Sequence, residues 1–468
     1  MDDFLREIQT SVFREWINNQ KKDYYHLHQS ETDPDAIIIE NEYCYSYVTF
    51  NPQCIIELCV MNKRTDEMAF YLHFQFKTLK HAISLFEEMD QCIKKMIDQP
   101  ICRLLLCCSG GMTTTFFADK IKNGIKVLNL NMEVAATSYQ KIYNVAQNYD
   151  VILLAPQVSY VKLQVEKVFK NKLVLKIPTQ IFASYNVGAL ITFIEESLKH
   201  KENKYNGYIE PLASMMEIKT NKNVLAVSIN ANGENSHISY RLYNSHQDIV
   251  LDSNIIKSNI KLQDVLDALD TVVLQNEMID VISIALPGVM VEGNVYSGII
   301  EGGNHQLKER LEKRYEKEIY LINDVNAAVV GYYASQNEYK SLAFLFQPIG
   351  RMAGSGIVVN GQLVRGMDHL AGEVALLPLN LSDAYLTLAN TPEGTLELVT
   401  KNIMSIIAIV APEAIVVYSD LILDSQDVSD EIKKALSQYP LKVYPQIIKV
   451  ENILEYILLG AMILSAKE

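Results

Sequence analysis

The chain has 468 residues, of which 49% are hydrophobic, and its formal net charge is −14 at pH 7. Such an acidic balance disfavours binding to nucleic acid or to an anionic membrane surface. No segment has the length and apolarity of a membrane span, and no apolar signal region follows the first residues. We therefore expect a cytoplasmic protein without membrane insertion.

The length predicts more than one domain. The first block, residues 1–100, begins with an amphipathic stretch at residues 4–17 and ends with a helical pattern at residues 79–96. Between them lie β-rich runs, of which the last alternates strongly between apolar and polar residues, as a half-buried strand does. These runs are residues 36–40, 44–50, 55–61 and 68–76. We expect a small α+β module with an antiparallel sheet, whose role the residues do not indicate.

The second block, residues 101–200, alternates strand-like runs with helical patterns. This alternation predicts a doubly wound parallel sheet that helices cover on both faces. The expected strands are residues 103–108, 127–136, 151–155 and 173–177. A polar stretch then predicts a linker over residues 201–222, and a third, mixed α/β block follows over residues 223–468.

Cys108 lies where the first strand of the second block ends and a helix begins. The small residues after it let several backbone N–H groups converge near a helix N-terminus, which favours an anion. A cysteine in this position is a candidate nucleophile and phosphate acceptor, although a buried core cysteine is the alternative and is the expected role of Cys107. The candidate phosphate loop comprises Ser109, Gly110, Gly111, Met112, Thr113 and Thr114.

Residues 101–198 resemble the IIB component of lactose/cellobiose-type bacterial phosphotransferase systems. The resemblance rests on Leu-Leu-Cys-Cys-Ser-Gly-Gly-Met-Thr-Thr at residues 105–114 and on Asp-Val-Ile-Leu-Leu-Ala-Pro-Gln-Val-Ser-Tyr at residues 150–160. It implies that Cys108 accepts phosphate from a IIA component and passes it to a sugar held by a membrane IIC component. A tyrosine phosphatase would need an arginine where Thr114 stands, so phosphatase action is disfavoured.

The third block contains Ile-Asn-Asp-Val-Asn-Ala-Ala at residues 322–328 and Ala-Gly-Glu at residues 371–373. Through these and two further stretches it resembles the ROK family of sugar kinases and regulators, which have the actin-like/hexokinase ATPase fold. Asp324 follows a strand and begins a helix, so it is either a catalytic carboxylate or an ordinary helix cap. The resemblance implies that Asp324 is the base that removes a proton from the sugar hydroxyl. It also implies that Asn323 and Glu373, and more weakly Asn304, bind sugar hydroxyls. The matching stretches are residues 284–288, 322–328, 354–366 and 371–373.

Several departures from the ROK pattern remove nucleotide-binding elements. The family's Asp-Ile-Gly-Gly-Thr becomes Ser228-Ile-Asn-Ala-Asn232, which lacks the aspartate that helps to hold Mg²⁺. The second phosphate motif becomes residues 350–354, Gly-Arg-Met-Ala-Gly, and the adenosine turn becomes Tyr418-Ser-Asp420. The zinc site is also missing, because Leu376 replaces its histidine and no cysteine follows Cys108. We expect no metal and no zinc, and ATP with Mg²⁺ only if the domain is an active kinase.

These patterns favour a regulatory or sensory protein of carbohydrate uptake, with a phosphorylatable Cys108 and a domain that binds a sugar or sugar phosphate but has lost efficient kinase activity. Its expected partners are a IIA component or another phosphotransferase protein and, by resemblance, a second copy in a homodimer. Three alternatives stay open: an active divergent sugar kinase, a working IIB phosphocarrier, and a scaffold with two relic sites. A DNA-binding regulator is disfavoured, because the first block shows no helix-turn-helix.

Overall fold

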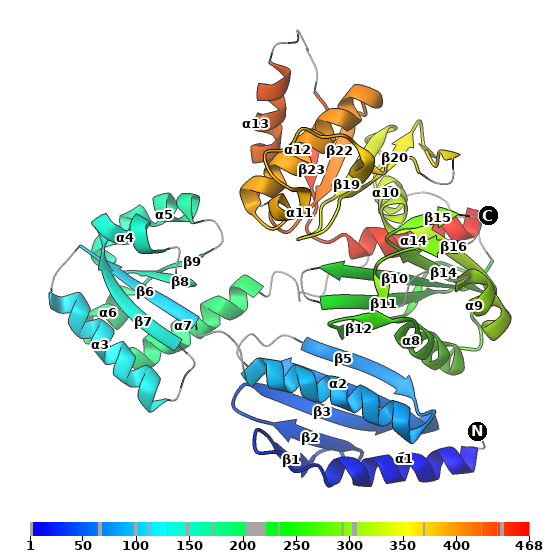
Figure 1. Cartoon of the computed structure of the whole chain (residues 1–468), viewed down its shortest axis with the longest axis horizontal. Coiled ribbons are helices and arrows are strands. Elements are labelled where there is room, and N and C mark those ends of the chain that lie inside the picture. The colour runs from blue at the N-terminus through cyan, green and yellow to red at the C-terminus, as the bar shows by residue number, and fades with distance from the viewer. Residues whose placement is uncertain are drawn as a thin grey trace.

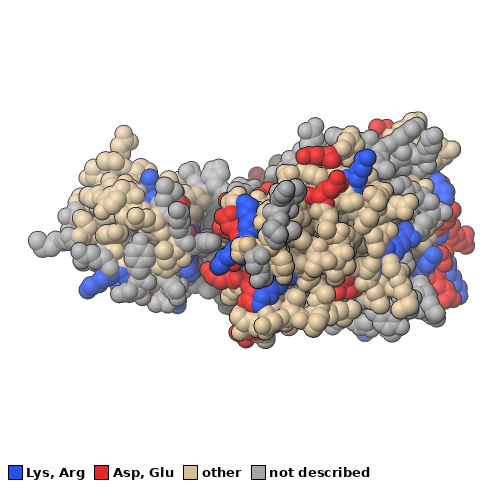
Figure 2. Space-filling view, turned by 90° about the horizontal axis from the view of Figure 1, so that it is seen from above, with Lys and Arg blue, Asp and Glu red and all other residues tan. Residues whose placement is uncertain are grey.

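The computed structural model describes most of the 468-residue chain (Figure 1). It describes residues 3–467 except 64–67, 98–101, 110–111, 129, 131, 147–148, 170–171, 203–220, 233–234, 292–293, 302–306, 368–369, 423, 438 and 440–443. No helix within the described ranges has both the length and the apolarity that a bilayer crossing needs. On the face seen in Figure 2, basic and acidic side chains are interspersed, without a broad basic field.

The first block is the α+β module that the sequence predicts. Five antiparallel strands follow one another in the sheet, and a long helix, α2 (Leu79–Ile97), packs on them through Leu85, Phe86 and Met89. A second helix, α1 (Asp3–Asn18), buries Phe13 and Ile17 in the same core. The strands are β1 (His26–Gln29), β2 (Ala36–Glu40), β3 (Cys44–Asn51), β4 (Ile55–Asn62) and β5 (Met68–Gln75).

This sheet does not end at β5 but continues into the third block. Strand β5 pairs antiparallel with β12 (Ile249–Lys257), where Tyr71 lies opposite Ile256. The sheet then adds β11 (Asn235–Tyr243), β10 (Val224–Asn232), β14 (Val281–Leu286) and β18 (Glu318–Asn323), for ten strands in all within the described residues. Residues 102–202 therefore lie in sequence between two parts of one sheet.

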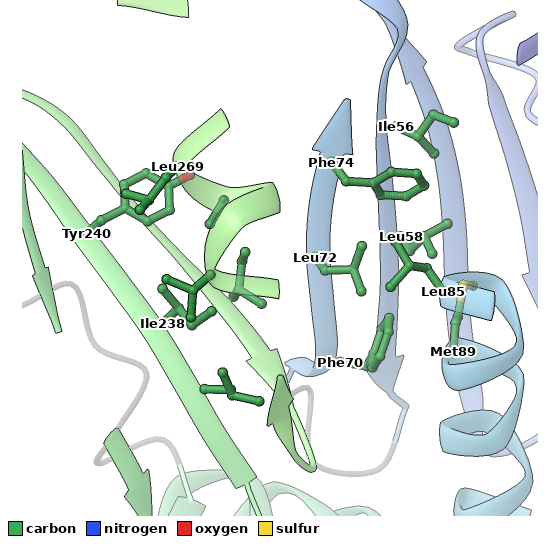
Figure 3. Close-up of a cluster of buried hydrophobic side chains, with 14 of the residues drawn as sticks. Ile56, Leu58, Phe70, Leu72, Phe74, Leu85, Met89, Ile238, Tyr240 and Leu269 are labelled. Atoms are coloured by element: carbon green, nitrogen blue, oxygen red, sulfur yellow. The ribbon is translucent and has the colours of Figure 1, made fainter. Parts of the chain in front are cut away.

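A single hydrophobic core joins the two parts of this sheet. Leu72 and Phe74 of β5 belong to the same buried cluster as Ile238 of β11 and Leu269 of α8 (Leu262–Gln275), as Figure 3 shows. Polar contacts cross the same boundary. The His73 side chain is hydrogen-bonded to Tyr240 Oη at 2.7 Å, and burial lowers the pKa of His73 to about 4, which leaves the ring neutral at pH 7.

A buried lysine makes a second tie between the two parts. Lys257 is 2% exposed, and its ammonium group lies 2.5 Å from Glu88 of α2 and 2.6 Å from Asp264 of α8. A buried charge is tolerated only where opposite charges surround it, so this lysine requires both carboxylates. The amino-terminal module is thus held to the third block by both apolar and ionic contacts.

The second sheet of the third block repeats the topology of the first. In the first sheet, β11 pairs antiparallel with β10 on one side and β12 pairs antiparallel with β11, while β14 and β18 run parallel to β10 on the other side. In the second sheet, β20 (Gly354–Val359) pairs antiparallel with β19 (Leu342–Phe346), and β21 (Gln362–Leu363) pairs antiparallel with β20. Parallel β22 (Ala414–Tyr418) and β23 (Gln446–Lys449) lie on the other side of β19. Two such α/β halves are the arrangement expected of an actin-like ATPase fold.

The remaining elements of the third block connect or cover these sheets. They are β13 (Ile260–Lys261), β15 (Val289–Val291), β16 (Asn294–Tyr296), β17 (Ile300–Glu301), α9 (Leu307–Tyr315), a 3₁₀ turn at Val374–Leu376, α11 (Tyr385–Leu388), α12 (Pro392–Ile409) and α13 (Ser425–Leu436).

Two helices cross between the halves at a pair of glycines. Helix α10 (Asp324–Ala334) packs on β19 and β20, and α14 (Leu454–Lys467) packs on β10 and β14. A Cβ atom at Gly331 would overlap the carbonyl oxygen of Tyr456, and one at Gly460 would overlap that of Ala327. The two backbones are therefore in direct contact, which only glycine permits.

The second block forms the expected doubly wound parallel sheet, in the order β7-β6-β8-β9. One correction concerns the strand expected over residues 127–136, because helix α3 (Met112–Val127) extends to residue 127 and the strand begins at Met132. The elements are β6 (Cys102–Cys108), α3, β7 (Met132–Ser138), α4 (Ile142–Val145), β8 (Val151–Leu154), a 3₁₀ segment at Pro156–Val161, α5 (Lys162–Val168), β9 (Leu173–Lys176), α6 (Thr179–Ser184) and α7 (Val187–Glu202).

Gly460→Ala should destabilise the third block strongly, because the added methyl group would push the crossing helices apart. We expect a loss of about 3 kcal/mol in the free energy of unfolding, which lowers the melting temperature by roughly 6 to 12 °C. Thermal unfolding followed by circular dichroism measures the effect. Gly298→Ala is the matched control, since nothing lies within 4 Å of a Cβ at that glycine. Equal melting temperatures for the two variants would refute the crossing contact.

Candidate functional site

A cavity of about 410 Å³ lies between the two halves of the third block. Its walls come from the ends of β10, β18 and β19, the start of α10, the segments that follow β14, β16 and β19, the segment of Glu373 and Ala375, and α11. Small-molecule sites usually have volumes of about 300 to 1,000 Å³, so the cavity suits a small ligand. Three predicted sugar-binding residues line it together, namely Asn323, Asp324 and Glu373. The fourth, Asn304, lies outside the described residues.

Asp324 is a buried carboxyl group at the first residue of α10. Its side chain is 3% exposed, and its Oδ1 accepts a hydrogen bond from the backbone N–H of Val325 at 2.9 Å. Burial raises the pKa of Asp324 to about 7. The Val325 N–H offsets part of that rise, and the negative charge of Glu373 adds to it. A carboxyl group with a pKa near neutrality can accept or release a proton at physiological pH, as a general base must.

Glu373 is held beside Asp324 by an unusual turn at Gly372. The carbonyl oxygen of Gly372 accepts hydrogen bonds from the backbone N–H of Ser355 at 3.0 Å and from its Oγ at 2.9 Å. Gly372 has φ +90°, and a Cβ atom there would overlap the Ser355 carbonyl, so the turn requires glycine. Burial also raises the pKa of Glu373. The cavity therefore contains two carboxyl groups whose pKa values are both raised by burial.

Both polar atoms of the Asn323 side-chain amide form hydrogen bonds within the protein. Its Oδ1 accepts the backbone N–H of Asn326 at 3.0 Å and caps helix α10, while its Nδ2 donates to the carbonyl of Gly288 at 3.2 Å. The residue thus links the start of α10 to the loop after β14. Within the described contacts, Asn323 fixes the position of Asp324.

The segment 350–354, which we term the Gly350 loop, uses two of its backbone donors internally. The N–H of Gly350 donates to the carbonyl of Ala389 at 2.9 Å, and the N–H of Ala353 donates to Tyr385 Oη at 3.1 Å. Phosphate binding by a loop depends on backbone N–H groups that point at the ligand. These two N–H groups are directed instead at partners within the protein.

The buried side chain of Gln347 is hydrogen-bonded to the same loop. Its side chain is fully buried, its Nε2 donates to the carbonyls of Pro348 and Arg351 at 2.9 Å each, and its Oε1 accepts from Tyr385 Oη at 2.9 Å. Sequence patterns did not single out Gln347 or Tyr385, because they lie 38 residues apart and match no motif. Together they fix the shape of the cavity wall at the Gly350 loop.

The other two segments that depart from the ROK pattern lie at the ends of β10 and β22. On β10, Ser228 is fully buried and accepts a hydrogen bond from Asn230 at 3.3 Å, while Asn230 and Ala231 line the cavity. At the end of β22, the ring of Tyr418 packs on Phe346 with centroids 5.4 Å apart. No cluster of three or more His, Cys, Asp or Glu residues that could hold a metal ion occurs among the described residues.

The second candidate site surrounds Cys108, the last residue of β6. Its side chain is 5% exposed, and it lies beside Ser138, the last residue of β7. The sheet order changes direction between β6 and β8, and ligands of doubly wound sheets bind outside the strand ends at such a point. Tyr139 and Tyr160 follow the neighbouring strands, with ring centroids 6.4 Å apart. Cys108 thus lies at the edge of the sheet where chemistry is expected.

The predicted phosphate loop beyond Cys108 is described in part. Ser109 is exposed, and Met112, Thr113 and Thr114 form the first turn of α3. Gly110 and Gly111 lie outside the described residues. Cys107 is fully buried, and burial raises its pKa to about 12, so it remains a neutral core thiol at pH 7.

Comparisons with known proteins separate the chain into the same two regions. Residues 103–192 match the family model for the lactose/cellobiose-specific IIB subunit of the phosphotransferase system, and residues 233–394 match the model for the ROK family. The ROK match begins just after residues 228–232 and ends before Tyr418.

One curated relative is the oligo-β-mannoside-specific EIIB component of Bacillus subtilis. It is 29% identical over 65 residues, which are 14% of this chain and 63% of the relative. The chain therefore spans somewhat less than two thirds of that protein's length.

Similar solved structures include a ROK family protein of Streptococcus pneumoniae in complex with sucrose, with 17% identity and a TM-score of 0.41 over 52% of this chain and 98% of that one. Another is a putative N-acetylmannosamine kinase of Listeria monocytogenes, with 18% identity and a TM-score of 0.42 over 53% and 100%. A third is a ROK family glucokinase of Streptomyces griseus with glucose and AMPPNP, with 15% identity and a TM-score of 0.41 over 53% and 100%.

The two family matches confirm the resemblance that the motifs around Cys108 and Asp324 predict. The chain joins a segment of the phosphotransferase IIB type to a segment of the ROK type.

Proposed function

We propose that this protein senses carbohydrate for the sugar phosphotransferase system. In this proposal the third block binds a sugar without transferring phosphate from ATP, and the IIB-type block carries phosphate on Cys108. The observation that carries the proposal is the cavity that Asp324 and Glu373 line together, beside a Gly350 loop in which the N–H groups of Gly350 and Ala353 are already bonded.

The carboxyl groups support a ligand rich in hydroxyl groups. An ionised carboxylate accepts several hydrogen bonds, and those bonds are stronger than bonds between neutral groups. Asp324 and Glu373 come from separate elements and line one cavity of suitable size. A sugar hydroxyl that donates to Asp324 would supply a hydrogen bond that the buried carboxylate cannot receive from solvent.

The surroundings of the cavity fit Mg²⁺ and ATP poorly. Magnesium sites need carboxylates beside the phosphates, and the segment Ser228–Asn232 contains none. Phosphoryl transfer also depends on positioning at the phosphates, and the backbone N–H groups of Gly350 and Ala353 are bonded within the protein. The alternative of an active divergent kinase requires the loop to release Tyr385 and Ala389 first.

Cys108 supports phosphate transfer within the phosphotransferase system. A phosphohistidine of a IIA component would donate its phosphoryl group to the Cys108 thiolate, so that the P–N bond breaks, an S–P bond forms and the imidazole leaves. The position of Cys108 at the strand edge beside the start of α3 suits this reaction. A phosphocarrier that passes the group onward to a sugar is the alternative use of the same residue.

The chain connection supports a regulatory link between the two sites. Residues 102–202 are attached through α2 on one side and through β10 on the other. Strand β10 begins at Val224 and lines the cavity at its other end through Asn230 and Ala231. A change at the IIB-type block could therefore act on a strand that contacts the ligand.

Sugar binding should strengthen as pH rises through 7, because ionised Asp324 is the better hydrogen-bond acceptor. With a pKa of about 7, the ionised fraction and hence the affinity rise roughly tenfold between pH 6 and pH 8. Asp324→Asn should lose roughly tenfold or more in affinity at pH 8 and should abolish the pH dependence. Calorimetric titration with glucose, mannose and N-acetylglucosamine measures both effects.

Asp430→Asn is the control for this titration, because Asp430 is an exposed carboxylate on α13 outside the cavity. The control should bind sugar as the unaltered protein does. Unchanged sugar affinity in Asp324→Asn, or equal losses in both variants, would contradict a sugar site at Asp324.

Cys108 should be the residue that a phosphorylated IIA component of the lactose/cellobiose type modifies. The unaltered protein and Cys107→Ser should both accept phosphate, because Cys107 is fully buried in the core, whereas Cys108→Ser should accept none. Mass spectrometry of the intact chain and its peptides detects the transfer. Phosphate incorporation into Cys108→Ser would show that another residue is the acceptor.

A further inference from the structure

The cavity has an apolar wall in addition to its two carboxyl groups. We propose that it takes an uncharged glycoside, with the sugar ring at Asp324 and Glu373 and an apolar aglycone, or the C–H face of a second sugar, at this wall. This inference rests on the proposed sugar site and specifies its ligand class. The apolar wall consists of Phe346, Pro348, Met352 and Leu386.

The apolar wall has a fixed structure and keeps two large apolar side chains exposed. Phe346 is 7% exposed and packs against Tyr418, so its ring is fixed from behind. Met352 and Leu386 keep 45% and 53% of their surface exposed, although large apolar side chains usually gain from burial. Exposed apolar side chains that gather at one cavity indicate a place where a ligand covers them.

The backbone that carries Met352 is held in place on both sides. The carbonyl of Arg351 accepts from Gln347, and the N–H of Ala353 donates to Tyr385. Tyr385 begins the short helix α11, whose next residue is Leu386. One hydrogen-bond network thus positions both exposed apolar side chains, and the wall is already formed before a ligand binds.

The cavity disfavours an anionic ligand such as a sugar phosphate. A phosphate at the apolar wall would lose its hydration without gaining hydrogen bonds from Gly350 and Ala353, whose N–H groups are bonded elsewhere. The carboxyl groups of Asp324 and Glu373 would also repel it. Arg351 is the one basic residue among the described residues of the lining, and its side chain is exposed, so solvent screens its charge.

A glycoside satisfies both parts of the cavity. Its hydroxyl groups donate to the carboxylates, and its apolar part covers Met352 and Leu386. Methionine is flexible and polarisable, so it adapts to aromatic rings and to the C–H face of a sugar. The few polar groups then orient the ring, and the apolar wall supplies most of the added affinity.

Calorimetric titration at pH 8 tests this inference with three forms of each sugar. The probes are glucose, mannose and N-acetylglucosamine, each as the free sugar, the phenyl β-glycoside and the 6-phosphate. For the sugar that binds, we expect the phenyl glycoside to bind at least roughly tenfold more tightly than the free sugar, as burial of one apolar group allows. The 6-phosphate should bind no more tightly than the free sugar.

Met352→Ala should reduce the advantage of the phenyl glycoside several-fold and leave the affinity for the free sugar unchanged. Leu386→Ala should do the same, because it removes the other exposed part of the wall. Met367→Ala is the matched control, since Met367 is 79% exposed and lies outside the cavity, and it should bind all probes as the unaltered protein does.

The outcomes separate this inference from the proposed function. If the free sugar binds as tightly as its phenyl glycoside, the apolar subsite is refuted while the sugar site stands. Tighter binding of the 6-phosphate would also overturn the inference, and loss of that binding in Arg351→Ala would assign the phosphate to Arg351. If none of the probes binds, the proposed sugar site fails and this inference fails with it.

Discussion

The arrangement of the third block depends on the backbone contact between α10 and α14. At Gly331 and Gly460 the two helices approach so closely that a side chain on either would overlap the other helix. Helix α10 packs on the second sheet and α14 on the first, so this crossing fixes the distance between the halves. The cavity lies between the same halves, and Asp324 is the first residue of α10. The contact between these two helix backbones thus helps to position the buried carboxyl group of Asp324 in the cavity.

The sheet of the amino-terminal module continues into the first sheet of the third block. Its last strand adds to the edge of the first sheet, and a buried lysine, Lys257, draws carboxylates from α2 and α8 to one point. Because the sheet and the core are continuous, the IIB-type block is bordered in sequence by two parts of one body. Strand β10 is the first strand that follows the IIB-type block in the chain, and its Asn230 and Ala231 line the cavity.

The sequence alone predicts the parts of this account that depend on short motifs. The loop after Cys108 and the α/β alternation around it follow from local patterns, whereas the Asn323–Asp324 and Gly372–Glu373 pairs follow from the resemblance to the ROK family. The hydrogen bonds of Gln347 with Tyr385 and Arg351 do not, because neither side chain belongs to a motif and the pair is brought together only by folding. The sequence also does not predict the pairing of β5 with β12, since these strands are about 180 residues apart in the chain. The role of Asn323 as a helix cap also emerges only from its contacts.

We propose that the cavity of the third block admits a sugar but not a nucleotide. Titration of the whole chain with Mg²⁺ and ATP, in the absence and presence of a bound sugar, tests it most directly. The account predicts no binding of ATP at concentrations up to the millimolar range that kinases use for their substrates, with or without sugar. Saturable ATP binding at micromolar to millimolar concentration would contradict it, because the Gly350 loop would then have to release Tyr385 and Ala389 to bind phosphate.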